Sequence, residues 1–356
     1  MRVLLAWLLA TLAWLPVAGA GEPANLTIIP SEPITLPPSG RAQILVSGTR
    51  EGRTVDLTRE VTFRSEPPGV VEVDEHGRLT ARIQGNARVV ASLGESRTEL
   101  EVHVAGSLSE PTFERDIQPI LARLGCNSGA CHGKASGQNG FKLSLLGFDS
   151  DSDYRAITRD ALGRRAWPGD PDGSLILTKA TASLPHGGGP RLSAGDPNHQ
   201  ALRAWIASGM PRDPEAAPSL TGISVQPTQR RLQPGEEQQV AVQAQYSDGS
   251  VRDVTALSAF QSSDSALVDV DEDGLIRAGT IPGEAAITAR FEGNFATCDI
   301  AIPLPGDIPS DFYASLPRRN FIDEHVWTKL QTLGLTPSEP ASDSTFLRRA
   351  YLDAIG

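Results

Sequence analysis

Two long stretches of the chain consist of short runs in which apolar and polar residues alternate. Between Val240 and Tyr246 the apolar positions recur at nearly every second residue, and the turn Ser247–Ser250 follows at once. An alternation of this period predicts a half-buried β-strand. Short runs of this kind, bounded by Gly or Pro, are typical of an antiparallel β-sandwich, so we expect both stretches to be all-β.

The two stretches are copies of one another. Asp56-Leu57-Thr58 recurs as Asp253-Val254-Thr255, and Val71–Asp74 recurs as Val268–Asp271, each pair lying 197 positions apart. These motifs resemble those of the bacterial Ig-like domains of group 2, over residues 25–104 and 220–303. The resemblance implies spacer or binding modules, and neither copy contains a catalytic cluster.

The segment at residues 111–212 has a helical pattern instead. Thr112 is a candidate N-cap for a helix, and a second helix is predicted from about Pro197 to Gly209. The apolar face of the first helix consists of Phe113, Ile117, Ile120, Leu121 and Leu124. We therefore predict a multidomain chain in which two all-β Ig-like sandwiches flank a small all-α domain.

Further helical patterns follow the second copy, at Arg319–Leu333 and Ser344–Gly356. Two helices cannot enclose a core of their own, so residues 319–356 are interpreted as the start of a helical domain of unknown function. On this interpretation the sequence is the front part of a longer protein.

The first residues predict export. Arg2 precedes an apolar run from Val3 to Val17, and the small residues Ala18-Gly19-Ala20 follow, which is the pattern of a secretory signal at residues 1–20. The run is too short for a transmembrane helix, so we expect an exported protein, periplasmic or on the cell surface. The net charge of -11 argues against nucleic acid as a partner.

The segment Cys126–His132 is the clearest candidate in the sequence for a cofactor-binding or metal-binding site. Two cysteines followed at once by a histidine are what covalent haem attachment requires, with the thiols on the porphyrin vinyl groups and His132 as the proximal iron ligand. The usual motif has two residues between the cysteines, whereas four lie between Cys126 and Cys131. The main alternative to haem attachment is a Cys126–Cys131 disulfide. A zinc site that also uses His186 and His199 is the weakest of the three interpretations.

A haem iron at this motif needs a second axial ligand. His186 is the candidate, because the His186–Gly189 loop stands just ahead of the closing helix and its glycines let the backbone approach a porphyrin closely. Met210, the only methionine after the predicted signal, is the alternative distal ligand. His199, in the first turn of the closing helix, is expected to be a surface residue.

The middle segment also resembles a known family, the planctomycete-type cytochrome c-like domain. The resemblance rests on Leu124–Lys134, Gly137–Ser144 and His186–Gly189. It implies that Cys126, Cys131 and His132 bind haem c, and that residues after 319 open a domain of unknown function. His186 as distal ligand is an inference from its position.

Together these observations predict an exported c-type haem protein that acts in electron transfer with an unidentified redox partner protein. The alternative is a haem-free cell-surface or adhesion protein with a Cys126–Cys131 disulfide. In that case the Ig-like modules would bind a ligand at the cell surface. No catalytic site is predicted in this sequence, so an enzymatic role would belong to a domain that the segment serves.

Overall fold

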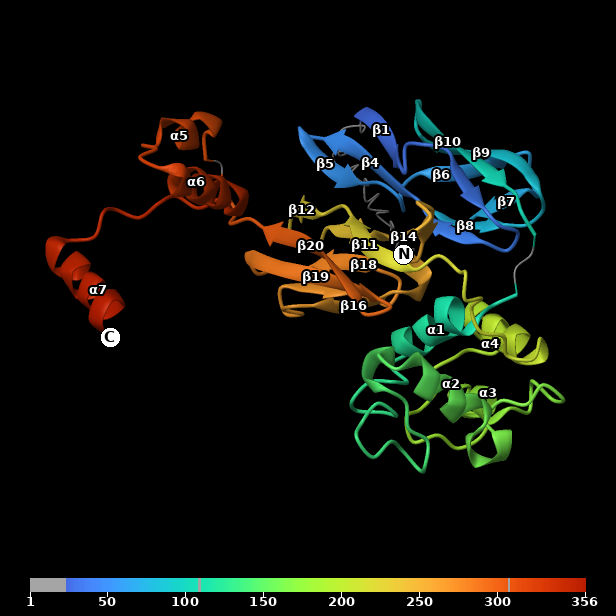
Figure 1. The fold of residues 1–356 in the computed structure, drawn as a ribbon. Helices are drawn as coiled ribbons and strands as arrows, with labels where there is room; N and C mark the ends of the chain where they lie inside the picture. The colour runs from blue at the N-terminus through green and yellow to red at the C-terminus, as the bar shows by residue number, and fades with distance from the viewer. Residues whose placement is uncertain (1–23, 108–109, 307) are drawn as a thin grey trace, which may run out of the picture.

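The computed structural model describes residues 24–107, 110–306 and 308–356. Two β-sandwiches lie side by side, a segment of short helices lies below them, and the last helices extend away on the other side (Figure 1). The signal predicted at residues 1–20 lies outside the described residues.

The first copy is built from three small sheets. Their strand orders are β1-β4-β5, β2-β10-β9-β6 and β3-β8-β7. All pairs are antiparallel except β2 with β10, which is parallel. The strands are β1 (Ala24–Ile29), β2 (Ile34–Leu36), β3 (Arg41–Gln43), β4 (Leu45–Arg50), β5 (Arg53–Asp56), β6 (Thr62–Glu66), β7 (Val71–Val73), β8 (Arg78–Ala81), β9 (Gly85–Leu93) and β10 (Ser96–Val104).

The second copy repeats this topology strand for strand, as the internal repeat predicts. Its sheets are β11-β14-β15, β12-β20-β19-β16 and β13-β18-β17, and β12 again pairs in parallel with β20. The strands are β11 (Leu220–Gln226), β12 (Gln229–Arg231), β13 (Glu237–Gln239), β14 (Ala241–Tyr246), β15 (Val251–Asp253), β16 (Ala259–Ser262), β17 (Val268–Val270), β18 (Leu275–Ala278), β19 (Gly283–Phe291) and β20 (Asn294–Ile302).

The repeated Asp-x-Thr motif forms the same corner in both copies. In the second copy Asp253 Oδ1 accepts the N–H of Thr255 at 3.0 Å, and Thr255 Oγ1 accepts the N–H of Val242 at 2.7 Å. Thr58 makes the equivalent bond to the N–H of Val46 at 2.9 Å in the first copy. The motif therefore satisfies backbone donors where a strand ends, which explains why it recurs.

The middle segment contains only short helical elements. They are η1 (Phe113–Ile117), α1 (Gln118–Arg123), η2 (Leu145–Gly147), α2 (Ser150–Thr158), η3 (Asp160–Gly163), α3 (Leu175–Ala180) and α4 (Pro197–Ala207). Long loops join them, because glycines and positive-φ residues such as Leu146 and Ala161 interrupt helical backbone.

The predicted fold class, with a distinct all-α domain between two sandwiches, is wrong. The chain is mostly β, in six sheets, and the helical parts are small. The buried side chains of the segment, among them Phe113 and Trp205, belong to one continuous core cluster with Val242 and Ile300 of the second copy. Phe113 and Trp205 also stack on each other, so the helical elements share a small core that is continuous with that of the second copy.

Ion pairs join the middle segment to the second copy. Arg252 of β15 pairs with Asp116 at 2.8 Å, and Arg123 of α1 pairs with Asp273 at 2.9 Å. Asp273 also accepts Arg78 of the first copy at 2.7 Å. One carboxylate therefore lies where all three parts of the molecule meet.

The last helices follow the second copy. They are α5 (Ser310–Ser315), α6 (Phe321–Leu333) and α7 (Asp343–Ile355), and Lys329 of α6 pairs with Glu284 of β19. Helix α7 lies apart from the other elements (Figure 1), and Phe346 and Ile355 on it are exposed. Among the described residues, none of the helices combines the length and the apolar content needed to span a bilayer.

Candidate functional site

The loop after α1 holds the cysteines and His132 that the sequence singles out. The Cys126 carbonyl accepts the N–H of His132 at 2.9 Å, and the Cys131 N–H donates to the Ser128 carbonyl at 3.0 Å. Gly133 is required here, because a Cβ at this position would lie 2.0 Å from the Asn127 carbonyl oxygen. The loop is therefore wound tightly by its own backbone, with both cysteine side chains half-buried.

The rings of His132 and His186 lie nearly parallel, with centroids 6.3 Å apart and 8° between their planes. His132 Nδ1 contacts the Phe141 carbonyl at 3.0 Å, and His186 Nδ1 contacts the Gly189 carbonyl at 2.8 Å. These contacts fix each Nδ1 as the protonated nitrogen and leave Nε2 with its lone pair. The structure thus brings together the two histidines that were proposed as axial ligands.

Burial lowers the pKa of His132, and the neighbouring His186 and Arg165 lower it further, against a bond to the Phe141 carbonyl that raises it. Arg165 lies over the Phe141 ring at 4.6 Å, and that ring contacts His132. The imidazole of His132 therefore favours its neutral form.

All three cysteines are free thiols in this structure. Burial raises the pKa of Cys126 to about 11, although Arg191 opposes the shift. Cys298 is fully buried in β20, and burial raises the pKa of its thiol to about 12. The Cys126–Cys131 disulfide of the alternative prediction is accordingly not formed here.

The other two residues named for this site lie elsewhere in the segment. Met210 follows α4, packs partly against the core, and its carbonyl accepts the Tyr154 hydroxyl at 2.9 Å. His199 lies in the first turn of α4, where its N–H donates to Asp196 at 2.6 Å. The Asp196 side chain thereby caps the helix, and the bond involves only the backbone of His199.

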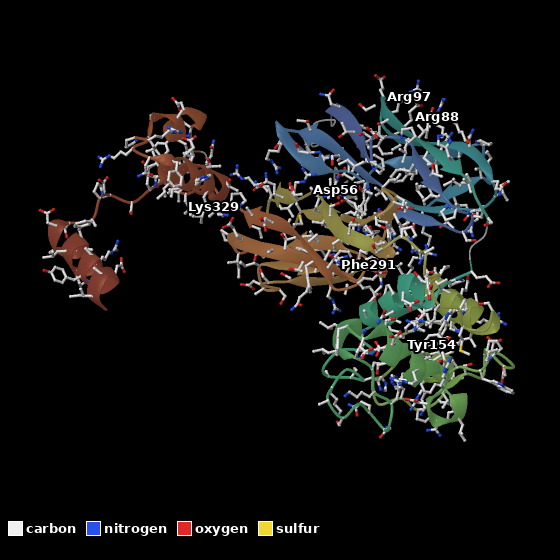
Figure 2. All side chains as sticks on the ribbon, in the orientation of Figure 1. Asp56, Arg88, Arg97, Tyr154, Phe291 and Lys329 are labelled. Carbon is white, nitrogen blue, oxygen red and sulfur yellow. The ribbon has the colours of Figure 1, made fainter. Side chains whose placement is uncertain are left out.

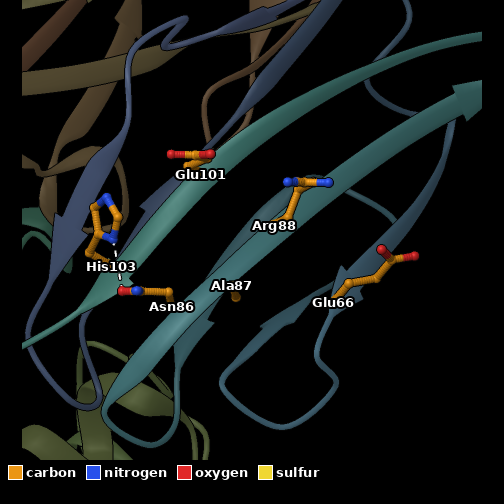
Figure 3. Close-up of a pocket in the computed structure, with 6 residues that line it drawn as sticks. All are labelled: Glu66, Asn86, Ala87, Arg88, Glu101 and His103. Atoms are coloured by element: carbon orange, nitrogen blue, oxygen red, sulfur yellow. Dashed lines mark hydrogen bonds between the residues drawn. The ribbon is translucent and has the colours of Figure 1, made fainter.

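A second candidate site lies on the free face of the sheet β2-β10-β9-β6 in the first copy. Alternation along β6, β9 and β10 places one set of side chains in the core and the other outside. Outer side chains, together with the buried Ala87, line a shallow hollow of about 290 Å³. Its lining residues (Figure 3) are Glu66, Asn86, Ala87, Arg88, Glu101 and His103.

This face combines charges of both signs. Arg88 Nε lies 3.6 Å from Glu99 Oε2, and His103 Nδ1 contacts Asn86 Oδ1 at 2.9 Å. These residues form no motif in the sequence, although the alternation that predicts the strands also divides the residues of each strand into an inner and an outer set. Nothing in the sequence indicates which of the outer faces stays free of neighbouring segments.

Comparison with known proteins finds a family for the second copy. The model of the bacterial Ig-like domain (group 2) matches residues 219–296. The second copy is thus similar to the Ig-like domains of this group. The first copy shares its strand order, so the resemblance inferred from the repeated motifs is supported for both.

One relative over most of the chain is Ice-binding protein 1 of Shewanella frigidimarina (strain NCIMB 400), which is 25% identical over 270 residues. The match covers 75% of this chain, and the chain spans 27% of that relative's length. Its name describes that protein and assigns no ligand to this one.

Two solved structures give weak similarities. Domains 5-6 of the S-layer protein SbsC align over 79% of this chain and 97% of that chain, with 10% identity and a TM-score of 0.31. The adhesin InvE of Yersinia pseudotuberculosis aligns over 24% of this chain and 26% of that chain, with 18% identity and a TM-score of 0.14. TM-scores this low support no functional conclusion.

The predicted membership of the planctomycete-type cytochrome c-like family is wrong, and so is the predicted function in haem-based electron transfer. The family match lies in an Ig-like copy, and the relative found over most of the chain is an ice-binding protein. In the part of the chain that the structure describes, no three His, Cys, Asp or Glu side chains form a group that could hold a metal ion.

Neither the comparisons nor the structure test the individual cofactor residues. Haem c on Cys126 and Cys131, with His132 and His186 as iron ligands, therefore stays a prediction, as does Met210 as the alternative ligand. The Ig-like family match agrees with the coarser statement that the protein is exported or lies at the cell surface.

Proposed function

We propose that this chain is the Ig-like part of a haem-free cell-surface protein of the adhesion type, and that the first copy holds its binding face. The observation that carries the proposal is the free, mixed-charge face of β6, β9 and β10 (Figure 3). In the second copy the middle segment contacts β15 of a three-stranded sheet, and α6 contacts Glu284 of β19 in the four-stranded sheet. We choose the face of the first copy because the hollow lined by charged side chains lies there.

The chemistry of the face defines the partner. Arg88 and Glu101 are charged, and Asn86 with His103 adds further hydrogen-bonding groups. Such a surface stays hydrated when free and favours a polar ligand that is itself hydrogen-bonding, such as an envelope glycan or a hydrophilic protein loop. Apolar ligands would lose more by desolvating these side chains than they gain.

The test uses the purified chain and intact cells of the producing bacterium from which the gene has been deleted. Binding is measured by flow cytometry for the parent and for the double variant R88A/E101A. We expect the double variant to bind roughly tenfold more weakly, because it removes two charged contacts worth about 0.7 kcal/mol each.

Asp299 offers a matched control, because it occupies on β20 the position that Glu101 occupies on β10. Its side chain is exposed, so D299A changes the charge without touching the proposed face. Equal loss of binding in D299A and in R88A/E101A, or full binding by the double variant, would overturn the proposal.

A further inference from the structure

His132 and His186 come from different loops of the middle segment and lie next to each other. Figure 2 shows the side chains of this segment, in which Tyr154 is labelled, below the two sandwiches. The two imidazole rings are nearly parallel, with centroids 6.3 Å apart and 8° between the planes. Both residues are only partly buried, so a solute can reach the rings. Imidazole is the commonest metal ligand among side chains, and it binds through a ring nitrogen.

The other nitrogen of each ring is held as in metal sites. His132 Nδ1 lies 3.0 Å from the Phe141 carbonyl oxygen, and His186 Nδ1 lies 2.8 Å from that of Gly189. A histidine that binds a metal almost always donates its other ring N–H to a carbonyl or carboxylate oxygen, which fixes the tautomer and the orientation of the ring. Both Nε2 atoms are therefore available to a metal ion.

We propose that Nε2 of His132 and Nε2 of His186 bind one transition-metal ion between them. The separation of the rings suits this arrangement. A metal–nitrogen bond to imidazole is about 2.0–2.1 Å long and a ring nitrogen lies about 1.15 Å from its centroid, so an ion midway between two imidazoles holds the centroids about 6.3–6.5 Å apart. The observed separation of 6.3 Å lies at the lower end of this range.

The same distance selects the class of metal. With the two nitrogens at a tetrahedral angle, as zinc prefers, the centroids would lie only about 5.1–5.3 Å apart. A separation of 6.3 Å requires the two nitrogens on opposite sides of a shared ion. Opposite imidazoles suit square-planar or tetragonal coordination, which is typical of Cu(II) and Ni(II). The site should therefore prefer copper or nickel to zinc.

The surrounding loops hold both rings in place before any metal binds. The backbone of His132 is fixed on both sides, because its N–H donates to the Cys126 carbonyl at 2.9 Å and its carbonyl accepts the N–H of Leu143 at 2.9 Å. Gly188 leaves room for the ring of His186, since a Cβ at this glycine would lie 3.0 Å from the Cε1 atom of that ring. Little ordering is left for the metal to impose, which favours binding.

The site is open on its remaining sides. In the described residues no group of three or more His, Cys, Asp or Glu side chains could hold a metal ion, so the other positions around the ion are left to water or to an added ligand. Neither Cys126 nor Cys131 takes part. Metal binding therefore needs no covalent haem, and it does not depend on what the first copy binds.

Isothermal titration calorimetry of the whole chain tests the site. The protein is made without a histidine tag and without a haem c maturation system, stripped of metal by chelation, and titrated with Ni²⁺ and with Zn²⁺ at pH 7.5. We expect one Ni²⁺ per chain, bound at least about tenfold more tightly than Zn²⁺, because opposed imidazoles suit nickel and not tetrahedral zinc. No Ni²⁺ binding by the parent, or equal affinity for the two metals, would overturn the proposal.

Variants assign the binding to the two rings. His132→Gln and His186→Gln should each bind Ni²⁺ at least about tenfold more weakly than the parent, because each removes one of only two protein ligands. The matched control is His199→Gln in the same segment, which should bind as the parent does, and so should Cys131→Ser. An equal loss in His199→Gln, or parental affinity in both His132→Gln and His186→Gln, would overturn the proposal.

Nuclear magnetic resonance tests the geometry in the parent itself, so the result does not depend on the folding of a variant. A small fraction of an equivalent of paramagnetic Cu²⁺, added under argon, broadens the signals of groups close to it. We expect the ring signals of His132 and His186 to broaden together, while those of His76 and His103 in the first copy stay sharp. Broadening of only one of the two rings, or of all four equally, would contradict a shared ion.

Discussion

At the scale of single residues, burial governs the chemistry of the loop that contains Cys126. The thiol is half-buried, and burial raises its pKa to about 11, so only a very small fraction is thiolate at neutral pH. Thiolate is the reactive form, so a thiol with this pKa reacts slowly. The cysteine loop is therefore expected to be structural rather than catalytic.

Alkylation measures this directly. With iodoacetamide at pH 8, Cys126 should react at least about 100-fold more slowly than an unperturbed thiol of pKa 8.5. Peptide mass spectrometry after timed quenching gives the rate, and the same sample in denaturant provides the reference. Equal rates for Cys126 in the folded and the denatured chain would show that the thiol is not protected.

The same sample tests the haem c prediction. Thioether bonds to haem would leave neither Cys126 nor Cys131 available for alkylation, even in denaturant, and would add the mass of haem to their peptide. Two alkylated thiols in protein made together with a haem c maturation system would show that prediction to be wrong.

His132 gives a prediction about pH. Its pKa lies below the usual 6.5 because of burial and of His186, so its contribution to stability is present above 6.5 and is lost as the pH falls. Removing the neighbouring ring in H186A should raise the pKa of His132, measured by NMR titration of the imidazole. The control H103A, on the distant first copy, should leave the pKa of His132 unchanged. If His132 had the same pKa in H186A as in the parent, His186 would not be a cause of the shift.

At the scale of elements, the Asp-x-Thr corner is the feature that both copies share most closely. Thr255 is buried, and its hydroxyl accepts the N–H of Val242 where β14 has no strand partner for that donor. The T255V variant keeps the shape of the side chain and removes the acceptor. Because a buried N–H is then unsatisfied, the free energy of unfolding should fall by about 1–3 kcal/mol.

Urea unfolding of the chain measures this loss. The control is T297V, at an exposed position of β20 in the same copy. It should change the free energy of unfolding by less than about 0.5 kcal/mol. A loss in T255V no larger than that in T297V would mean that the corner hydroxyl does not stabilise the copy.

The strands could be predicted from the sequence, whereas the packing of the helical segment could not. Alternation in Val240–Tyr246 and the repeated motifs indicate a sandwich because both follow from local backbone geometry. The face of η1 and α1 was also correctly assigned, since Phe113 and Ile117 are buried. What these residues pack against is a matter of tertiary structure, and the apolar pattern of a helix does not show whether its partner is another helix or a sheet.

The candidate sites differ in the same way. Sequence spacing selected His132 and His186, which the fold brings face to face, yet the same spacing led to a cytochrome assignment that the comparisons contradict. The charged face around Arg88 gave no motif, because a recognition surface on a sheet needs no fixed order of residues. Nor could the sequence show that Asp56 reaches the other copy.

At the scale of the whole molecule, two Ig-like copies are docked against each other, and the middle segment contacts the second copy. Asp273 at the junction of the three parts and Asp56, which accepts the N–H of Gln239 in the other copy, make the arrangement specific. On our proposal these contacts also orient the binding face of the first copy.

We propose that this assembly functions outside the cell. The most direct test is labelling of living cells that make the full-length protein with a biotin reagent that does not cross membranes, followed by mass spectrometry of the lysine peptides. We expect labelling of Lys134, Lys142 and Lys179 in intact cells. Labelling only after the cell envelope has been permeabilised, with a known surface protein labelled in both samples, would contradict it.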